Sequence, residues 1–264
     1  MKTKKIFAAN WKLNKTPEEA REFVISFKNK VFEKTDFFKN KEIIIFPQAF
    51  SLEAVSTLCA GSNIGYGPQN IYSEQSGAFT GENSAEIAKS LKAAYALVGH
   101  SERRQIFNEP DDLLNKKMQL LQSLETTPVF CIGENLNQRE AGKTLDVCFS
   151  QLEKGLGGQT SGQTSGQTND LASGLNKTKR FIIAYEPVWA IGTGKVATLE
   201  QVSEVHQHLQ SYLVAQGLLN FQLLYGGSVK PENSAELLNI PFVDGFLIGG
   251  AALKVDSFIQ ICGE

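Results

Sequence analysis

The sequence predicts an α/β protein in which eight parallel strands, surrounded by helices, close into a (β/α)8 barrel. Three observations support this: eight short apolar runs recur along 264 residues, helical patterns lie between them, and one such barrel needs about 250 residues. The alternation implies parallel strands with right-handed crossovers, for which an open sheet and a closed barrel are the two candidates. Eight units favour the barrel, and we expect residues 1–264 to form a single domain.

The expected strands are short runs rich in β-branched and aromatic residues. Most are apolar along their whole length, which is typical of strands buried on both faces. In chain order they are residues 6–9, 43–46, 64–67, 95–98, 129–132, 181–185, 221–224 and 246–248.

Two of the intervening helices carry clear start signals. The first has Thr16 as N-cap, Pro17 at the first helical position and Glu19 completing a capping box. The sixth repeats the pattern with Thr198 and Gln201. The apolar stripes that we expect in the core are Ala20, Phe23, Val24, Phe27 and Val31 in the first, and Val202, Val205, Leu209, Tyr212 and Leu213 in the sixth.

The sixth helix also carries two histidines, His206 and His208. Two residues correspond to about 200° around a helix axis, so these side chains cannot converge on one metal ion. We expect both to be solvated surface residues.

The stretch 155–177 interrupts the alternation with a repeated Gly-Gln-Thr-Ser pattern that has no apolar side chain. Such a stretch cannot bury enough surface to offset the entropy of ordering it. We expect a flexible low-complexity insertion rather than a domain, and its place before the sixth strand puts it on the face opposite the strands' carboxyl ends.

Composition narrows the function classes. The net charge is −2 and no basic stripe is present, which argues against nucleic acid as a partner. No apolar run approaches the roughly 20 residues of a membrane span, and the apolar run after Met1 is too short for a secretory signal. The cysteines, at positions 59, 131, 148 and 262, show no metal or redox spacing. We therefore expect a cytoplasmic protein with a small ligand.

One carboxylate follows a strand directly. Residues 181–185 read as a buried strand, Glu186 comes next, and Pro187 stops the strand because it lacks a backbone donor. Residues 188–195 are apolar and glycine-punctuated, which is the composition of a hinged lid. A carboxylate beside a lid that excludes water suits general-base chemistry.

The same lid also fits a dinucleotide-binding pattern formally, from Gly192 and Gly194 to Ala197. The context differs, because those glycines should close a turn directly after a strand and an acidic residue should end the next strand. Neither condition is met here, so we set this motif aside.

The residues 184–195, Ala-Tyr-Glu-Pro-Val-Trp-Ala-Ile-Gly-Thr-Gly-Lys, resemble the base-and-lid signature of the triosephosphate isomerase family. Further motifs of that family span nearly the whole chain. They are Asn10-Trp-Lys12, Gly77-Ala-Phe-Thr-Gly-Glu82, Val98-Gly-His-Ser-Glu-Arg-Arg104, Cys131-Ile-Gly-Glu134, Tyr225-Gly-Gly-Ser-Val229 and Gly245-Phe-Leu-Ile-Gly-Gly-Ala251.

This resemblance implies a TIM barrel that interconverts dihydroxyacetone phosphate and D-glyceraldehyde 3-phosphate through an enediol(ate), a step of glycolysis and gluconeogenesis, without cofactor or metal. It implies that Glu186 moves the proton and that His100 polarises the carbonyl. It also implies that Lys12 stabilises negative charge, Asn10 helps orient both groups and Glu102 gives polar support near Lys12. Taken alone, a lysine after a strand is more often a solvated charge, and a single histidine is more often structural.

The substrate phosphate is expected to be held by backbone N–H groups. Gly226-Gly227-Ser228 and Gly249-Gly250 follow the seventh and eighth strands, which is the usual phosphate position in such barrels. Gly192 in the lid would add a further N–H.

The segment 72–80 is too long for a simple turn between strand and helix. The resemblance implies that this loop docks into a twin subunit near Asn10 and His100, with Thr80 at its tip, which gives a homodimer.

Two other functions stay open at this point. One is a phosphosugar barrel in which Lys12 forms a Schiff base, although such a lysine needs an apolar or cationic setting that Asn10 and Trp11 do not supply. The other is a barrel kept only for binding or scaffolding, which would be indicated by loss of Glu186, His100 or Lys12, and all three are present.

Overall fold

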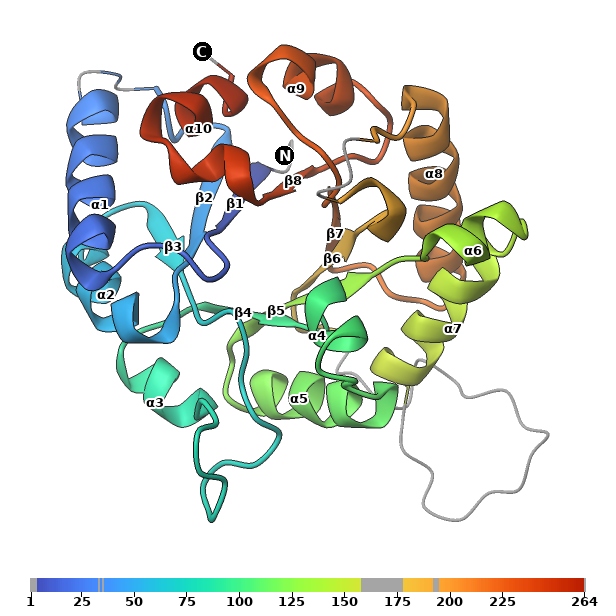
Figure 1. Cartoon of the computed structure of the whole chain (residues 1–264), viewed down its shortest axis with the longest axis horizontal. Helices are drawn as coiled ribbons and strands as arrows, with labels where there is room; N and C mark the ends of the chain where they lie inside the picture. The colour runs from blue at the N-terminus through green and yellow to red at the C-terminus, as the bar shows by residue number, and fades with distance from the viewer. Residues whose placement is uncertain (1–3, 33, 35, 158–177, 192–194, 264) are drawn as a thin grey trace.

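The computed structural model describes residues 4–32, 34, 36–157, 178–191 and 195–263. At its centre the strands form a parallel sheet, and helices lie around it (Figure 1). The strands are β1 (Lys5–Asn10), β2 (Lys41–Phe46), β3 (Ile64–Tyr66), β4 (Tyr95–Val98), β5 (Thr127–Ile132), β6 (Phe181–Tyr185), β7 (Phe221–Tyr225) and β8 (Gly245–Ile248). The sequence therefore located every one of these strands to within two residues at each end.

The helices follow the strands in the order expected of repeated β–α units. The α-helices are α1 (Pro17–Phe32), α2 (Leu52–Cys59), α3 (Ala85–Ser90), α4 (Ser101–Gln105), α5 (Asp111–Ser123), α6 (Leu136–Glu140), α7 (Thr144–Leu156), α8 (Leu199–Ala215), α9 (Pro231–Leu238) and α10 (Val255–Ile261). Short 3-10 helices are η1 (Ala49–Ser51), η3 (Val188–Ala190) and η4 (Gly250–Leu253). No helix in the described ranges is long and apolar enough to cross a membrane.

The sheet closes on itself, which confirms the barrel. Its strand order is β3-β2-β1-β8-β7-β6-β5-β4. The two end strands are joined by the N–H of Ala94 on the oxygen of Tyr66 and by the N–H of Leu97 on the oxygen of Pro68, both at 3.1 Å. Gly67 permits this approach, since a Cβ there would stand 1.7 Å from the oxygen of Tyr95.

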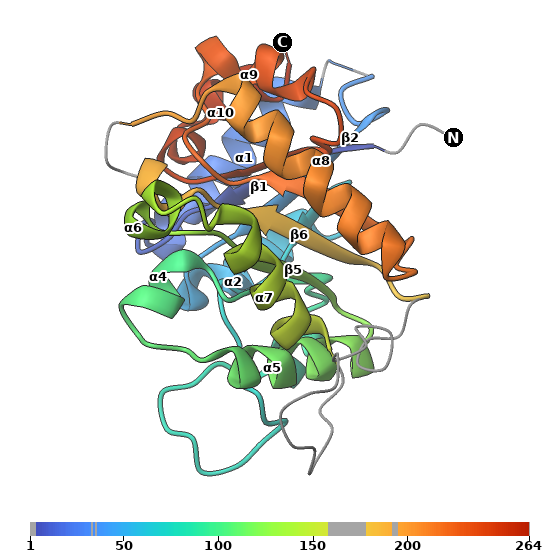
Figure 2. The same cartoon turned by 90° about the vertical axis from the view of Figure 1, so that its right-hand side faces the viewer.

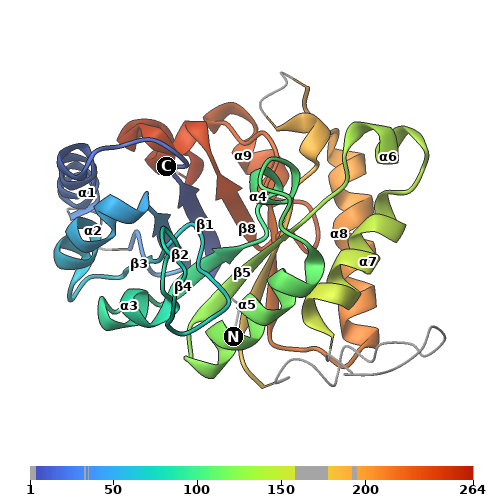
Figure 3. The same cartoon turned by 60° about the horizontal axis from the view of Figure 1, so that its bottom comes forward.

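Alternate strand residues point into the barrel and out toward the helices. In β1, Ile6 and Ala8 belong to the inner cluster, whereas Phe7 and Ala9 pack in the larger layer under the helices. The inner cluster comprises Ile6, Ala8, Ile44, Phe46, Leu97, Val129, Cys131, Ile182, Ala184, Leu224 and Leu247. Figures 2 and 3 show that the strands run toward the face that carries α4 and α6, while the N-terminus leaves from the opposite face. Inward-facing residues at or just after the carboxyl ends of the strands therefore lie at that face of the barrel.

The predicted start of α1 is confirmed. The N–H of Thr16 donates to a carboxylate oxygen of Glu19 at 2.7 Å, and the N–H of Glu19 donates to the Thr16 hydroxyl at 3.3 Å. In α8, Thr198 and Gln201 form the second capping box. The α1 stripe is buried as expected, while in the α8 stripe Tyr212 is only partly buried.

The first residues that the sequence assigned to the insertion belong to a helix. Gly155 and Leu156 belong to α7, and Gly157 is its C-cap. Residues 158–177, which contain the repeat, lie outside the described residues.

The expectation for His206 was wrong. Its side chain is completely buried on the α8 stripe, where Nδ1 lies 3.0 Å from the oxygen of Phe242, while His208 is exposed as expected. Burial lowers the pKa of His206 from 6.5 to about 4, and Lys5 adds to the decrease. The Phe242 carbonyl opposes it. The ring is therefore held neutral inside the fold.

We expect His206 to make the protein less stable in acid. Between pH 6.5 and 4 the unfolded chain binds a proton at this residue and the folded chain does not, so the free energy of unfolding falls as pH falls. The loss is about 2 kcal/mol at pH 5 relative to pH 7.5. Urea unfolding at fixed protein concentration should show that His206→Asn, whose amide can still donate to Phe242, has a smaller pH dependence. His208→Asn is the control and should match the unsubstituted protein.

Candidate active site

Glu186 extends the inward-facing set of β6. It follows Ile182 and Ala184 by the same two-residue step, and Pro187 ends the strand immediately after it. The side chain is only 2% exposed, so the carboxylate lies in the mouth of the barrel rather than in solvent. A buried charge must be paired, and its partners define the site.

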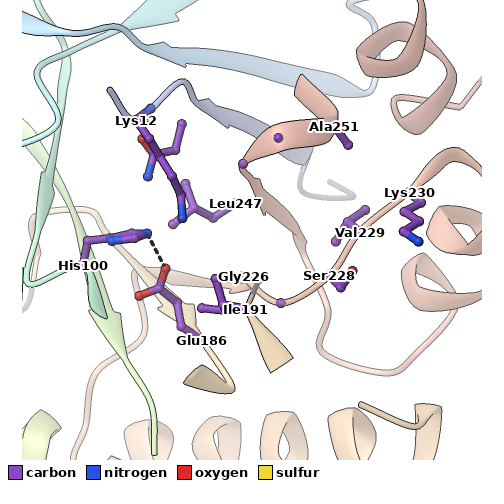
Figure 4. A pocket seen from close by; sticks show the side chains of 14 residues that line it. Lys12, His100, Glu186, Ile191, Gly226, Ser228, Val229, Lys230, Leu247 and Ala251 are labelled. Atoms are coloured by element: carbon purple, nitrogen blue, oxygen red, sulfur yellow. Dashed lines mark hydrogen bonds and ion pairs between the residues drawn. The ribbon is translucent and has the colours of Figure 1, made fainter. Parts of the chain in front are cut away.

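Both carboxylate oxygens of Glu186 have partners on the segment after β4. His100 Nε2 lies 3.0 Å from Oε1 (Figure 4). The N–H of Ser101 donates to Oε2 at 2.9 Å. The pKa of Glu186 reflects opposed effects, because burial raises it while His100, the Ser101 N–H and Lys12 lower it. The lowering prevails, so the carboxylate is ionised at neutral pH.

His100 is oriented by its own backbone. It is the N-cap of α4, and its Nδ1 accepts the N–H of Glu102 at 3.3 Å. An accepting Nδ1 carries no proton, so the ring is assigned as the neutral tautomer with its proton on Nε2. Burial is the largest single influence on the pKa of His100 and lowers it, but the charge and hydrogen bond of Glu186, together with the charge of Glu102, raise it above its ordinary value. The Glu102 N–H disfavours a proton on Nδ1, so the proton stays on Nε2. The histidine therefore presents an N–H donor to the mouth.

Lys12 approaches the same space from β1. Its backbone is left-handed, with φ at 51°, a conformation that costs a non-glycine residue about 1–3 kcal/mol. The N–H of Lys12 donates to Asn10 Oδ1 at 3.0 Å, and its Nζ lies 2.7 Å from Glu102 Oε1. Asn10 is the next inward residue of β1, so these side chains line one wall.

The opposite wall is made of glycine backbone. A cavity of about 300 Å³ is lined on one side by Asn10, Lys12, His100 and Glu186, and on the other by Gly226, Gly227, Ser228, Gly249 and Gly250. A Cβ at Gly226 would stand 2.9 Å from Glu186 Cγ, and one at Gly227 would stand 2.2 Å from the Tyr225 hydroxyl. Side chains are thus excluded where an anion could contact backbone N–H groups.

These parts suit one kind of chemistry. A dry carboxylate can accept a carbon-bound proton, a neutral imidazole N–H and an ammonium can stabilise a developing oxyanion, and glycine backbone can hold a phosphate. Within the described ranges, no group of three or more His, Cys, Asp or Glu side chains is arranged to hold a metal ion.

The comparison with known proteins decides the family. The triosephosphate isomerase family model matches residues 5–264 of the chain. The chain belongs to the triosephosphate isomerase family. The triosephosphate isomerase of Bdellovibrio bacteriovorus is 49% identical over 258 residues, which cover 98% of each chain. Those of Geobacter metallireducens and Psychromonas ingrahamii are 43% and 41% identical, each over 96% of this chain and 95% of theirs.

The structure brings most of the residues that the family resemblance singled out into this one mouth. Asn10, Lys12, His100, Glu186, Ser228, Gly249 and Gly250 all line the cavity. Glu102 pairs with Lys12 at the edge, as expected. Gly192 lies outside the described residues, as do Thr193 and Gly194 of the expected lid.

Sequence reasoning missed Glu134, although it stands in a motif quoted for the family. Its fully buried carboxylate accepts from the Tyr185 hydroxyl at 3.2 Å and from Trp189 Nε1 at 2.8 Å. Trp189 belongs to η3, directly after Glu186 and Pro187. Glu134 therefore anchors the segment that follows the carboxylate. The signal in the sequence was a charged residue two positions after the buried β5.

Proposed function

We propose that this member of the triosephosphate isomerase family interconverts dihydroxyacetone phosphate and D-glyceraldehyde 3-phosphate with Glu186 as the base. The observation that carries the assignment is the meeting of Glu186 and His100 Nε2 at 3.0 Å in a buried mouth opposite glycine backbone. The reaction moves a proton between adjacent carbons and leaves the overall oxidation state unchanged. It needs no external electron carrier.

Glu186 takes the proton from one substrate carbon and returns it to the neighbouring carbon. Its two oxygens accept from His100 and from the Ser101 N–H, and because His100 Nε2–H is also the donor assigned to the substrate oxygens, we expect the His100 contact to be exchanged for substrate before transfer. Release from this donor raises the basicity of the carboxylate at the moment it is used. The low pKa of Glu186 keeps the resting base ionised.

The two oxygens of the reacting carbons need stabilisation as the enediolate forms. His100 Nε2–H is the donor for them, and Lys12 supplies a fixed positive charge in a site shielded from water. Asn10 holds the N–H of Lys12 and lines the same cavity. Ser228, Gly249 and Gly250, with Gly192 from the lid, are assigned to the phosphate.

A coupled assay in each direction tests the activity. We expect efficient isomerisation by the purified chain, and its absence would reject the proposal. The Schiff-base alternative is tested by borohydride with substrate, which would trap a covalent adduct on Lys12. Lys12 is paired with Glu102 rather than placed in an apolar or cationic setting, so we expect no adduct.

We also propose that the protein works in the cytoplasm, as is typical of its family, where the reaction serves glycolysis and gluconeogenesis. Cys59, Cys131 and Cys148 are buried thiols that form no disulfide. Unpaired thiols are typical of proteins in a reducing compartment.

We further propose a homodimer formed through the loop around Tyr72–Thr80. This loop projects from the barrel between β3 and α3, and Tyr72 packs on Phe79 with ring centroids 4.5 Å apart (Figure 1). Beside the site lies a second hollow of about 340 Å³, which is lined by Asn10, Lys12 and His100, by further polar side chains and by apolar residues. Its apolar members Leu13, Ile106 and Phe107 are 61–88% exposed. The hollow offers a twin subunit's loop a place next to the reacting groups.

Phe107→Asp should weaken this dimer, because it replaces an exposed aromatic ring at the hollow by a charge. We expect a shift toward monomer by light scattering and a fall in kcat/KM of at least about tenfold, since Lys12 and His100 border the hollow. Leu219→Asp is the matched control, because Leu219 is 76% exposed but precedes β7 at the other end of the barrel. A Phe107→Asp monomer with full activity would reject the role given to the interface.

A further inference from the structure

Gln69 does not line the reaction cavity, yet its side chain reaches the backbone of Lys12. Gln69 Nε2 donates to the oxygen of Lys12 at 2.8 Å and to the oxygen of Phe46 at 3.0 Å. Phe46 ends β2, and Lys12 lies two residues beyond β1. One side-chain amide therefore joins the loop after β3 to the carboxyl ends of β1 and β2.

These contacts continue the strand ladder past its end. The last β1–β2 pair is Asn10 with Phe46, and the N–H of Trp11 still donates to the oxygen of Phe46 at 3.1 Å. Beyond that point no further β1–β2 pair is formed in the described register. Gln69 joins the two segments just past this point, because its amide donates to the carbonyl of Lys12 after β1 and to the carbonyl of Phe46 at the end of β2.

The peptide groups of Lys12 are bound on both sides. Asn10 Oδ1 accepts its N–H, and Gln69 Nε2 donates to its C=O. Left-handed φ is unfavourable for lysine, so surrounding contacts must maintain it. Removal of one contact lets φ relax to its ordinary range, and that rotation carries the side chain away from His100 and Glu186.

We propose that Gln69 is a positioning residue that holds Lys12 in the left-handed conformation from which its ammonium reaches the substrate site. This inference rests on the proposed function, in which Lys12 stabilises the oxyanion. Gln69 itself touches no substrate atom in this scheme.

Gln69→Met tests the proposal, since methionine has a similar volume and no donor. We expect kcat/KM to fall about 10- to 100-fold, as is usual when a reacting group is misplaced by about 1 Å. In a Lys12→Met background the same change should alter kcat/KM by less than about twofold, because the group that it positions is already gone. Gln69→Asn, whose amide is one methylene shorter, should reproduce the loss and replaces Gln69→Met if that variant does not fold.

Ser51→Ala is the matched control. Ser51 Oγ donates to the oxygen of Lys15 at 3.1 Å, in the same loop but not on Lys12. It should leave kcat/KM unchanged. Equal losses in the two Lys12 backgrounds, or no loss from Gln69→Met, would overturn the proposal while leaving the isomerase assignment intact. An inactive unsubstituted protein would instead reject that assignment.

Discussion

Glu186→Gln is expected to reduce kcat by about 10⁴-fold, which is close to 5–6 kcal/mol of transition-state stabilisation. The amide has nearly the same shape and cannot accept the carbon-bound proton. Its oxygen can still accept the Ser101 N–H, while its NH2 group then faces His100 Nε2, so the hydrogen bond to His100 is lost or requires the other tautomer of the ring. The measurement is the coupled assay on protein made in a host that lacks its own isomerase, because a trace of host enzyme would hide so large a loss.

Phosphate binding provides the control for this variant. The Glu186 carboxylate accepts from His100 and Ser101 rather than from the backbone that we assign to phosphate, so inhibition by inorganic phosphate should keep its inhibition constant within about twofold. Urea unfolding at pH 7.5 should show a change in the free energy of unfolding of less than about 2 kcal/mol, because the desolvation cost removed with the charge partly offsets the lost hydrogen bond to His100. A near-normal rate would show that another group is the base.

The barrel could be predicted because its signals are local. Capping boxes such as Thr16 with Glu19 join residues three positions apart, and strand runs need only hydrophobic pattern. His206 shows a local signal that was misread. It stands four residues after Val202 and three before Leu209, on the buried stripe, but its polarity suggested the surface.

The contacts that set the chemistry could not be predicted from pattern, because they join distant residues. Ser101 and Glu186 are 85 positions apart, and Gln69 is 57 from Lys12. The family resemblance named the reacting side chains but not the amide groups that hold them. The folded barrel brings the residues after β4 close to the residue after β6, and this is what allows His100 and Ser101 to contact Glu186.

Closure of the barrel also explains why charge can be kept in so dry a mouth. Glu186, His100 and Lys12 follow the ends of β6, β4 and β1, so the closed barrel brings the three groups to one place. Each group lowers the cost of burying the next, since the carboxylate is paired with the imidazole and the ammonium lowers the carboxylate's pKa. Removing the ammonium should therefore lower the rate of reaction more than it lowers the free energy of unfolding.

Lys12→Met is expected to lower kcat/KM by about 10³-fold, or about 4 kcal/mol, because the developing oxyanion loses its fixed positive charge. Methionine keeps an unbranched apolar stem, and Gln69 and Asn10 still bind the backbone at this position. The effect should appear in both kcat and KM, since an ammonium near the phosphate and the carbonyl oxygen acts before and during proton transfer. The free energy of unfolding should change by less than about 1 kcal/mol, because the pair with Glu102 is partly exposed.

Glu102→Gln separates the ammonium from its ion pair. This variant removes the carboxylate 2.7 Å from Lys12 Nζ, but it keeps the Glu102 backbone N–H that orients His100. If the positive charge acts on substrate, Glu102→Gln should cost less than about tenfold while Lys12→Met costs about 10³-fold. Similar losses in the two variants would mean that the pair as a unit shapes the site. That result would require the oxyanion to be stabilised by His100 alone.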